Sequence, residues 1–197
     1  APLGWVAVGM VRWCLQEWLT VRVSTDSWRS SARITALGVL SITMDARPSF
    51  DVSVGSDQPV GSTLLVGQAN IGMAGVTAVD YLVRNLDSTT IGNIAPEGLP
   101  AIAPFEDGVP RHHSRLHTLD GTGVTVLIAE LFMPIGASRP FADAVLDWTT
   151  SNDIDQVVVL HGVPFPHGPE EHEVFHVATT DFRDRRLPAE LFRPLRG

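Results

Sequence analysis

The sequence predicts an α/β protein built as a three-layer sandwich, with helices on both faces of a mainly parallel sheet. Short apolar runs that fit buried strands occur at residues 62–67, 124–131 and 156–162. Two stretches with helical periodicity, residues 73–86 and 138–151, lie between these runs. Strands and helices that alternate in this way are typical of a parallel sheet with helices packed on its faces.

The first strand–helix unit begins after Pro59 and Gly61. Residues 62–67 form its predicted strand, and a loop of small residues continues to Gly75. In the helix predicted over residues 73–86, the apolar side chains fall mainly on one side, as expected for a helix that packs against a sheet.

The middle of the chain, residues 91–121, is rich in glycine and proline. This composition predicts an irregular segment with short edge strands. The segment holds a cluster of imidazole and guanidinium groups, which we interpret as part of a solvated loop. The members of this cluster are Arg111, His112, His113, Arg115 and His117.

The second half of the chain continues the alternation. Residues 124–131 predict a central strand, and residues 138–151 predict a helix with Ser138 as its N-cap. A buried strand is predicted at residues 156–162, and the alternation of side chains predicts a fourth strand at residues 174–180. The side chains of the helix that are expected to point inward are Phe141, Val145 and Trp148.

The charge of the chain is strongly biased. Its length of 197 residues suits one domain, and its net charge is -8, with 22 acids against 14 basic residues that are all arginine. An acidic surface repels phosphate groups, so neither nucleic acid nor an anionic membrane is an expected partner. Acid excess without lysine fits the salt-filled cytosol of an extreme halophile, although a GC-rich genome that encodes arginine in place of lysine would leave the same bias.

Cysteine usage indicates a reducing compartment. The single cysteine, Cys14, cannot form an internal disulfide, so we expect a cytoplasmic protein. The longest uncharged apolar run near the start, residues 1–11, ends at Arg12 and is too short to span a bilayer.

The first 43 residues differ in composition from the rest. They hold four arginines against two acids, and four of the five tryptophans. They are either an extra element that packs its tryptophans on the domain or sequence upstream of a true start at Met44, and the composition favours the second interpretation. We therefore expect a non-native or disordered extension over residues 1–43, a lead-in over residues 44–61, an α/β domain over residues 62–187 and an irregular tail over residues 188–197.

A series of short motifs follows in order along the body. The most specific is the loop Gln68-Ala69-Asn70-Ile71-Gly72-Met73-Ala74-Gly75, between a strand that ends in Gly67 and a helix that contains Tyr81-Leu82. The others are Ile91-Gly92, Phe105-Glu106-Asp107-Gly108, a strand that ends in Glu130, a helix with Trp148 and a strand that ends in His161-Gly162. In this order the motifs resemble the archaeal members of the proteasome assembly chaperone family, over residues 62 to about 181.

The resemblance implies a phosphorylase/hydrolase-like α/β sandwich. It also implies a chaperone-like factor that binds proteasome subunits or other proteins, with self-association as a further expectation, and it implies no enzymatic activity. Ala69 and Asn70 stand where the family usually shows proline and glycine. The family also continues past the fourth strand with further elements, whereas this sequence runs from Arg183 into Pro188, so we expect a truncated C-terminal part.

Gly67, Gly72 and Gly75 could cradle a phosphate at the start of a helix. Their spacing matches neither phosphate-binding motif, and the chain has no lysine to reach a phosphate. We therefore expect a structural role, in which Gly67 lets the chain turn while Gly72 and Gly75 let the helix approach the sheet. No cofactor is expected.

His172-Glu173-Val174-Phe175-His176 matches the H-E-x-x-H pattern of zinc proteases. That mechanism needs the motif on a helix, so that both imidazoles share one face. Here the composition is that of a strand, in which the two histidines would lie about 13 Å apart. We therefore expect no metal site at this motif.

A pocket remains an open alternative at the ends of the predicted strands. Ligands of α/β proteins bind where parallel strands end, so Glu130, His161 and His167 could converge there. Such a crevice would fit a small-molecule hydrolase or ligase, and this is the alternative to a protein-binding role. We find no nucleophile with a convincing base, so no catalytic residue is predicted.

Overall fold

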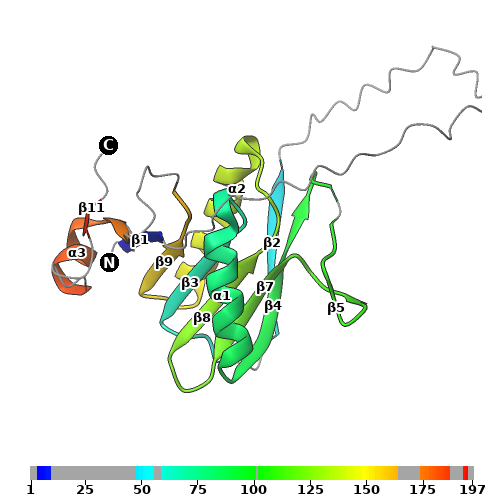
Figure 1. Ribbon diagram of the computed structural model, residues 1–197, viewed down its shortest axis with the longest axis horizontal. Helices are drawn as coiled ribbons and strands as arrows, with labels where there is room; N and C mark the ends of the chain where they lie inside the picture. Colours follow the sequence, from blue (N-terminus) through cyan, green and yellow to red (C-terminus); the bar gives the residue numbers. More distant parts are fainter. Residues whose placement is uncertain are drawn as a thin grey trace, which may run out of the picture.

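A computed structural model describes residues 4–9, 48–55, 59–100, 102–163, 174–186 and 193–194. Within them, the predicted strands and helices occur in the predicted order, and further strands lie between the two long helices (Figure 1). The helices are α1 (Ala74–Asn85), α2 (Ile135–Ser151), α3 (Thr180–Arg186) and the short 3-10 helix η1 (Ile71–Met73). The strands are β1 (Gly4–Gly9), β2 (Ser49–Val54), β3 (Thr63–Gln68), β4 (Ser88–Glu97), β5 (Phe105–Glu106), β6 (Val109–Pro110), β7 (Ser114–Leu119), β8 (Val124–Ala129), β9 (Gln156–Leu160), β10 (Phe175–Ala178) and β11 (Arg193–Pro194).

One sheet of nine strands forms the middle layer, in the order β11-β10-β1-β9-β3-β8-β7-β4-β2. Its centre is parallel: β1 pairs with β9, β9 with β3, and β3 with β8. The flank β8-β7-β4-β2 is antiparallel throughout. The predicted α/β class is therefore confirmed, with the parallel strands at the centre and antiparallel strands beside them.

Helix α2 covers one face of the sheet. Phe141 and Val145 point from it into an apolar cluster with Leu64, Leu116 and Leu127 of three different strands. The ring of Phe141 meets Phe50 of β2 edge to face, with centroids 5.2 Å apart. The predicted inward positions of Phe141 and Val145 are confirmed, and Trp148 is partly buried against the same cluster.

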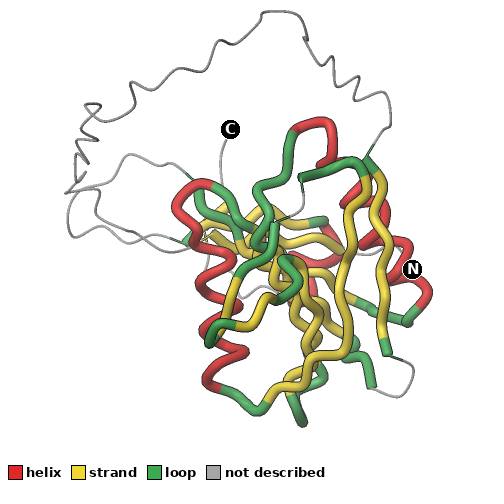
Figure 2. The backbone as a smooth tube through the Cα atoms, turned by 90° about the vertical axis from the view of Figure 1, so that its right-hand side faces the viewer, coloured by secondary structure: helices red, strands yellow, loops and turns green. Residues whose placement is uncertain are grey.

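Helix α1 covers the opposite face, as the view in Figure 2 shows, where the sheet stands between two helices. Val76 and Val79 of α1 pack on Val126 and Ile128 of β8 and on Leu119 of β7. Alternate residues of β8 thus serve the two faces, because successive side chains of a strand point to opposite sides. The predicted three-layer arrangement follows directly.

The segment predicted to be irregular, residues 91–121, is the largest departure from expectation. It contains most of β4 and all of β7, and every residue of β7 is buried. Residues 105–110 form a small hairpin of β5 and β6 instead of joining the sheet. The glycines and prolines that suggested a loop all lie outside β7, which pairs with both β4 and β8.

Three segments expected to lie outside the domain contribute strands. The lead-in contains β2, which pairs with β4 at one edge of the sheet. Gly4–Gly9, within the extension expected over residues 1–43, forms β1 between β9 and β10. Residues 10–43 lie outside the described residues, so their expected separation from the domain stays a prediction. In the expected tail, β11 pairs with β10.

Helix α2 begins one turn earlier than predicted. Pro134 is its N-cap, and Ser138 lies inside the helix with its Oγ donating to the carbonyl oxygen of Pro134 at 3.2 Å. Serine favours a cap position but can also donate back to the preceding turn of a helix, and here it does so. Across the described part of the chain, no helix is long and apolar enough to cross a bilayer.

Candidate functional site

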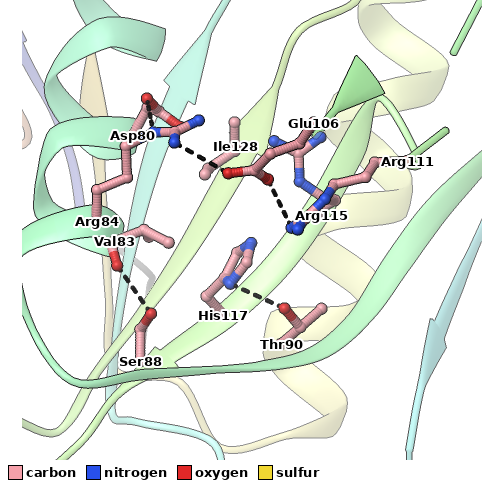
Figure 3. Close-up of a pocket in the computed structure, with 10 residues that line it drawn as sticks. All are labelled: Asp80, Val83, Arg84, Ser88, Thr90, Glu106, Arg111, Arg115, His117 and Ile128. Carbon is pink, nitrogen blue, oxygen red and sulfur yellow. Dashed lines mark hydrogen bonds and ion pairs between the residues drawn. The ribbon is translucent and has the colours of Figure 1, made fainter. Parts of the chain in front are cut away.

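A polar pocket of about 300 Å³ lies on the α1 face of the sheet, between α1 and the hairpin β5–β6 (Figure 3). Its floor is made by β4, β7 and β8, one wall by α1 and the other by the hairpin β5–β6 with the residue that follows. The side chains that line it are Asp80, Val83, Arg84, Ser88, Thr90, Glu106, Arg111, Arg115, His117 and Ile128.

A chain of ion pairs forms the outer rim of this pocket. Arg84 Nε lies 2.6 Å from a carboxylate oxygen of Asp80, one turn earlier on α1. Arg84 Nη1 lies 2.9 Å from Glu106 Oε1, and Arg111 Nη1 lies 2.8 Å from Glu106 Oε2. Glu106 thus bridges two arginines and ties the hairpin to α1.

His117 stands at the floor of the pocket and is only 4% exposed. Its Nδ1 lies 3.2 Å from the hydroxyl of Thr90 on the neighbouring strand. Its Nε2 is buried and has no hydrogen-bond partner among the described residues. Burial, with smaller contributions from Arg115 and Arg111, lowers the pKa of His117 to about 4, so the ring is neutral near pH 7.

Arg115 connects this pocket to the carboxyl edge of the central strands. Its Nη1 donates to the backbone carbonyl of His112 at 2.6 Å and pairs with Glu130 Oε2 at 2.7 Å. With its side chain only 10% exposed, Arg115 is the most buried of the arginines in these ion pairs. Glu130 is therefore already engaged in holding a buried charge.

Of the predicted pocket residues, the structure describes Glu130 and His161, which follow strands that are not neighbours in the sheet. Glu130 follows β8 and His161 follows β9, and β3 lies between these strands, which places their ends about 9.5 Å apart. His161 is exposed and its Nδ1 interacts with Asn70 Nδ2. His167 lies outside the described residues, so the convergence of the three side chains stays a prediction.

The three loop glycines have roles different in detail from those expected. A Cβ on Gly75 would come within 2.1 Å of the Leu160 carbonyl oxygen, and one on Gly67 within 2.3 Å of Val79. These two glycines therefore permit the close approach of α1 to the sheet. Gly72 instead provides the turn, with a φ of 74° and open space around it.

The described end of the H-E-x-x-H pattern lies in a strand. His176 is in β10, where a helix would be needed for the zinc-protease arrangement, and this matches the strand expected over residues 174–180. His172 and Glu173 lie outside the described residues. No group of three or more His, Cys, Asp or Glu is placed to hold a metal ion in the described part of the chain, and the absence of zinc stays a prediction.

The polar pocket was not predicted from the sequence, because the cluster of residues 111–117 was assigned to a solvated loop. His113, Arg115 and His117 are in fact buried. A signal was present in the alternation Arg115-Leu116-His117, which places one apolar side chain on the α2 face and two polar ones on the other. The surrounding glycines and prolines obscured it.

A second surface, here called the carboxyl rim, consists of exposed apolar side chains beyond the ends of β3, β8 and β9. Parallel strands end at one edge, so the residues that follow them lie along it. A Cβ on Gly162 would approach the carbonyl oxygen of Ile71 to 2.3 Å, so the segments after β3 and β9 touch. The members of the carboxyl rim are Ile71, Met73, Phe132, Ile135 and Val163.

Solved structures share this fold at low sequence identity. A protein of unknown function from Thermoplasma acidophilum is similar, with a TM-score of 0.60 and 23% identity over 70% of this chain and 56% of that one. PbaA of Pyrococcus furiosus, described as an archaeal homologue of proteasome-assembly chaperone, has a TM-score of 0.55 and 18% identity over 64% of this chain and 54% of that one. A monoclinic form of PbaA gives a TM-score of 0.56. The chain thus spans just over half the length of these proteins.

Sequence comparison places the chain in a family. Among curated proteins, none matches it. Residues 64–195, from β3 to beyond β11, match the PAC2 family. This match includes the parallel strands β3, β8 and β9, both large helices and the polar pocket. The chain therefore belongs to the PAC2 family.

Proposed function

We propose that this PAC2 domain is a protein-binding, chaperone-like factor that acts on the proteasome or its subunits. The likeness to PbaA, an archaeal homologue of proteasome-assembly chaperone, supports this role. The observation that carries the proposal is the carboxyl rim, where Ile135 is 96% exposed, Phe132 63% and Ile71 60%. Large apolar side chains gathered at one edge are typical of a surface that another protein covers.

The charge of the chain favours apolar contacts at this surface. Its net charge of -8 keeps the protein soluble, while salt screens attraction between exposed charges at an interface. Burial of apolar side chains is not weakened by salt in this way, and some salts strengthen it. An acidic, lysine-free protein in a halophilic archaeal cytoplasm would therefore bind its partner best through a rim of this kind.

The enzymatic alternative has less support. A hydrolase or ligase crevice at Glu130 and His161 would need side chains that are free to reach a substrate. Glu130 already pairs with Arg115, and His161 with Asn70. A protein-binding role does not require Glu130 and His161 to leave these contacts.

The test is a binding experiment with purified proteasome α and β subunits in molar salt. We expect the intact chain to bind one of them and the double variant Phe132→Asp/Ile135→Asp to lose at least tenfold in affinity. Aspartate at residue 135 lies in the first turn of α2, where it favours the helix, so loss of folding should not explain the effect.

The matched control is Tyr81→Asp, which places a charge on α1 outside the carboxyl rim, at a side chain about as exposed as Phe132, and should leave affinity unchanged. Sedimentation of the chain alone distinguishes binding to proteasome subunits from self-association through the same rim. Failure of the intact chain to bind either subunit would refute the proposal.

A further inference from the structure

The polar pocket beside α1 contains a feature that the folded chain does not use. His117 is buried at its floor, yet its Nε2 has no partner among the described residues. Buried polar atoms in proteins are nearly always satisfied, and an exception calls for a ligand or a water. Figure 3 shows the ring beneath Glu106 and Arg111, with Nδ1 directed at Thr90 and the other nitrogen on the side of Glu106 and Arg111.

The hydrogen-bonding groups that remain free in the pocket are mainly donors. Glu106 accepts from Arg84 and Arg111 with its two oxygens. Each recorded ion pair of Arg111 and Arg115 engages only Nη1, whereas a guanidinium carries five N–H groups. When the hydroxyl of Thr90 donates to Nδ1 of His117, Nε2 carries a hydrogen and becomes a further donor.

Charge and size restrict the ligand. Three arginines and two carboxylates line the pocket, and Glu130 pairs with Arg115 from outside it, so a ligand with several negative charges would leave the site strongly anionic. A volume of about 300 Å³ lies at the small end of the range for ligand sites. Val83 and Ile128 add an apolar wall that can cover an aliphatic group.

We propose that the pocket between α1, β4, β7 and the hairpin β5–β6 binds a small aliphatic monocarboxylate. The carboxylate accepts hydrogen bonds from His117 Nε2 and from N–H groups of Arg111 and Arg115, while the aliphatic part lies against Val83 and Ile128. This site is separate from the carboxyl rim, so the inference does not depend on the proposed function.

The test is titration of ¹⁵N-histidine-labelled protein with butyrate, followed by NMR of the imidazole nitrogens. We expect saturable binding with a Kd of about 1 mM or tighter and a shift of the His117 signals, which are assigned by their absence in His117→Gln. The bound anion should also raise the pKa of His117, because a negative charge nearby favours the imidazolium form.

Two further ligands distinguish the chemistry. Butyramide has the shape of butyrate without its charge and should bind at least tenfold more weakly, since charge-assisted hydrogen bonds are lost. Equal binding of butyramide would overturn the carboxylate assignment, as would inorganic phosphate that displaces butyrate at equal concentration. Absence of any saturable shift with butyrate would overturn the site itself.

Variants test the residues without removing the fold. Arg111→Gln changes a side chain that is 43% exposed and should weaken butyrate binding about tenfold while the protein stays folded. The matched control is Arg139→Gln, which removes a 90% exposed arginine of α2 on the opposite side of the sheet and should leave binding unchanged. Equal affinity in the two variants would overturn the role of Arg111 in the site.

Discussion

The two faces of the sheet are filled in different ways. On the α2 face, apolar side chains of β3, β7 and β8 meet Phe141 and Val145, and the apolar cluster extends from Val157 on β9 to Phe50 on the edge strand β2. On the α1 face, the helix covers β3 and β8, and the space over β4 and β7 is closed by ion pairs of the hairpin β5–β6. One face is a continuous apolar core, and the other is half core and half polar pocket.

This difference between the two faces indicates which part of the molecule can hold a binding site. An apolar layer stabilises the fold through area removed from water and tolerates no polar group without a partner. Strand β4 serves both faces, because successive side chains of a strand point to opposite sides: Thr90 faces the pocket and Ile91 packs into the α2 core. Stability is thus expected to depend mainly on the α2 face, and binding of a small ligand on the polar pocket of the other face.

The largest effect is expected from Phe141→Ala in the α2 core. This ring is 6% exposed and fills the space between α2, β2 and the centre of the sheet, so its removal leaves a cavity. We expect a loss of about 3–5 kcal/mol in the free energy of unfolding, measured by denaturant titration. Ile135→Ala, on the same helix but 96% exposed, should change the value by less than about 0.5 kcal/mol. Similar losses in the two variants would contradict a core confined to the inner side of α2.

The next largest loss of stability is expected from a substitution where α1 packs closely on the sheet. In Gly75→Val, the new side chain would meet the Leu160 carbonyl oxygen, whose position is fixed by the sheet. We expect a loss of about 3 kcal/mol and a lower thermal midpoint. Gly136 in α2 has open space around its Cβ position, so Gly136→Ala should stabilise by about 0.5 kcal/mol or more. A stable Gly75→Val protein would show that α1 can lift from the sheet.

The sequence was sufficient to predict the elements with regular patterns. The strands β3, β8 and β9 are continuous apolar runs, and α1 and α2 show helical periodicity, so their existence and order were predicted correctly. The start of α2 was misplaced by one turn because a serine that bonds back to the preceding turn is indistinguishable, in sequence, from a cap.

The polar pocket could not be predicted because its residues become neighbours only through tertiary structure. Arg84 of α1 and Glu106 of the hairpin are 22 residues apart, and no local pattern connects them. His117 lies in a strand whose pattern combines polar and apolar residues on both faces, which resembles a loop when flanked by glycine and proline. Burial of such residues depends on the partners that α1 and β5–β6 supply.

A pH titration tests the buried state of His117. Its pKa is lowered from 6.5 to about 4 in the folded protein, chiefly by burial. Above pH 6.5 the ring is neutral in both states and contributes nothing to pH dependence. As the pH falls from 6.5 toward 4, the unfolded chain binds a proton that the folded protein does not, so stability falls by up to about 1.4 kcal/mol per pH unit.

The matched variant is His117→Gln, which cannot titrate. Its free energy of unfolding should fall less steeply than that of the native protein between about pH 6.5 and pH 5, in thermal or denaturant melts. The pKa of His113 is also lowered by burial. Because His113 titrates in both proteins, its contribution cancels in the difference between them. Identical slopes would mean that His117 is accessible to protons in the folded state.

The smallest effect is expected from the exposed end of the ion-pair chain. Asp80→Asn removes the pair with Arg84, whose side chain is 55% exposed, and screening by water and salt leaves such pairs weak. Asp80 is the main cause of the raised pKa of Arg84, yet the arginine stays charged in either protein over the usable pH range. We expect a change below about 0.5 kcal/mol in low salt and none in molar salt, measured by denaturant titration in both. A loss that persists in molar salt would instead show that Asp80 orders the wall of the polar pocket, and the contrast between a stabilising α2 face and a binding α1 face would need revision.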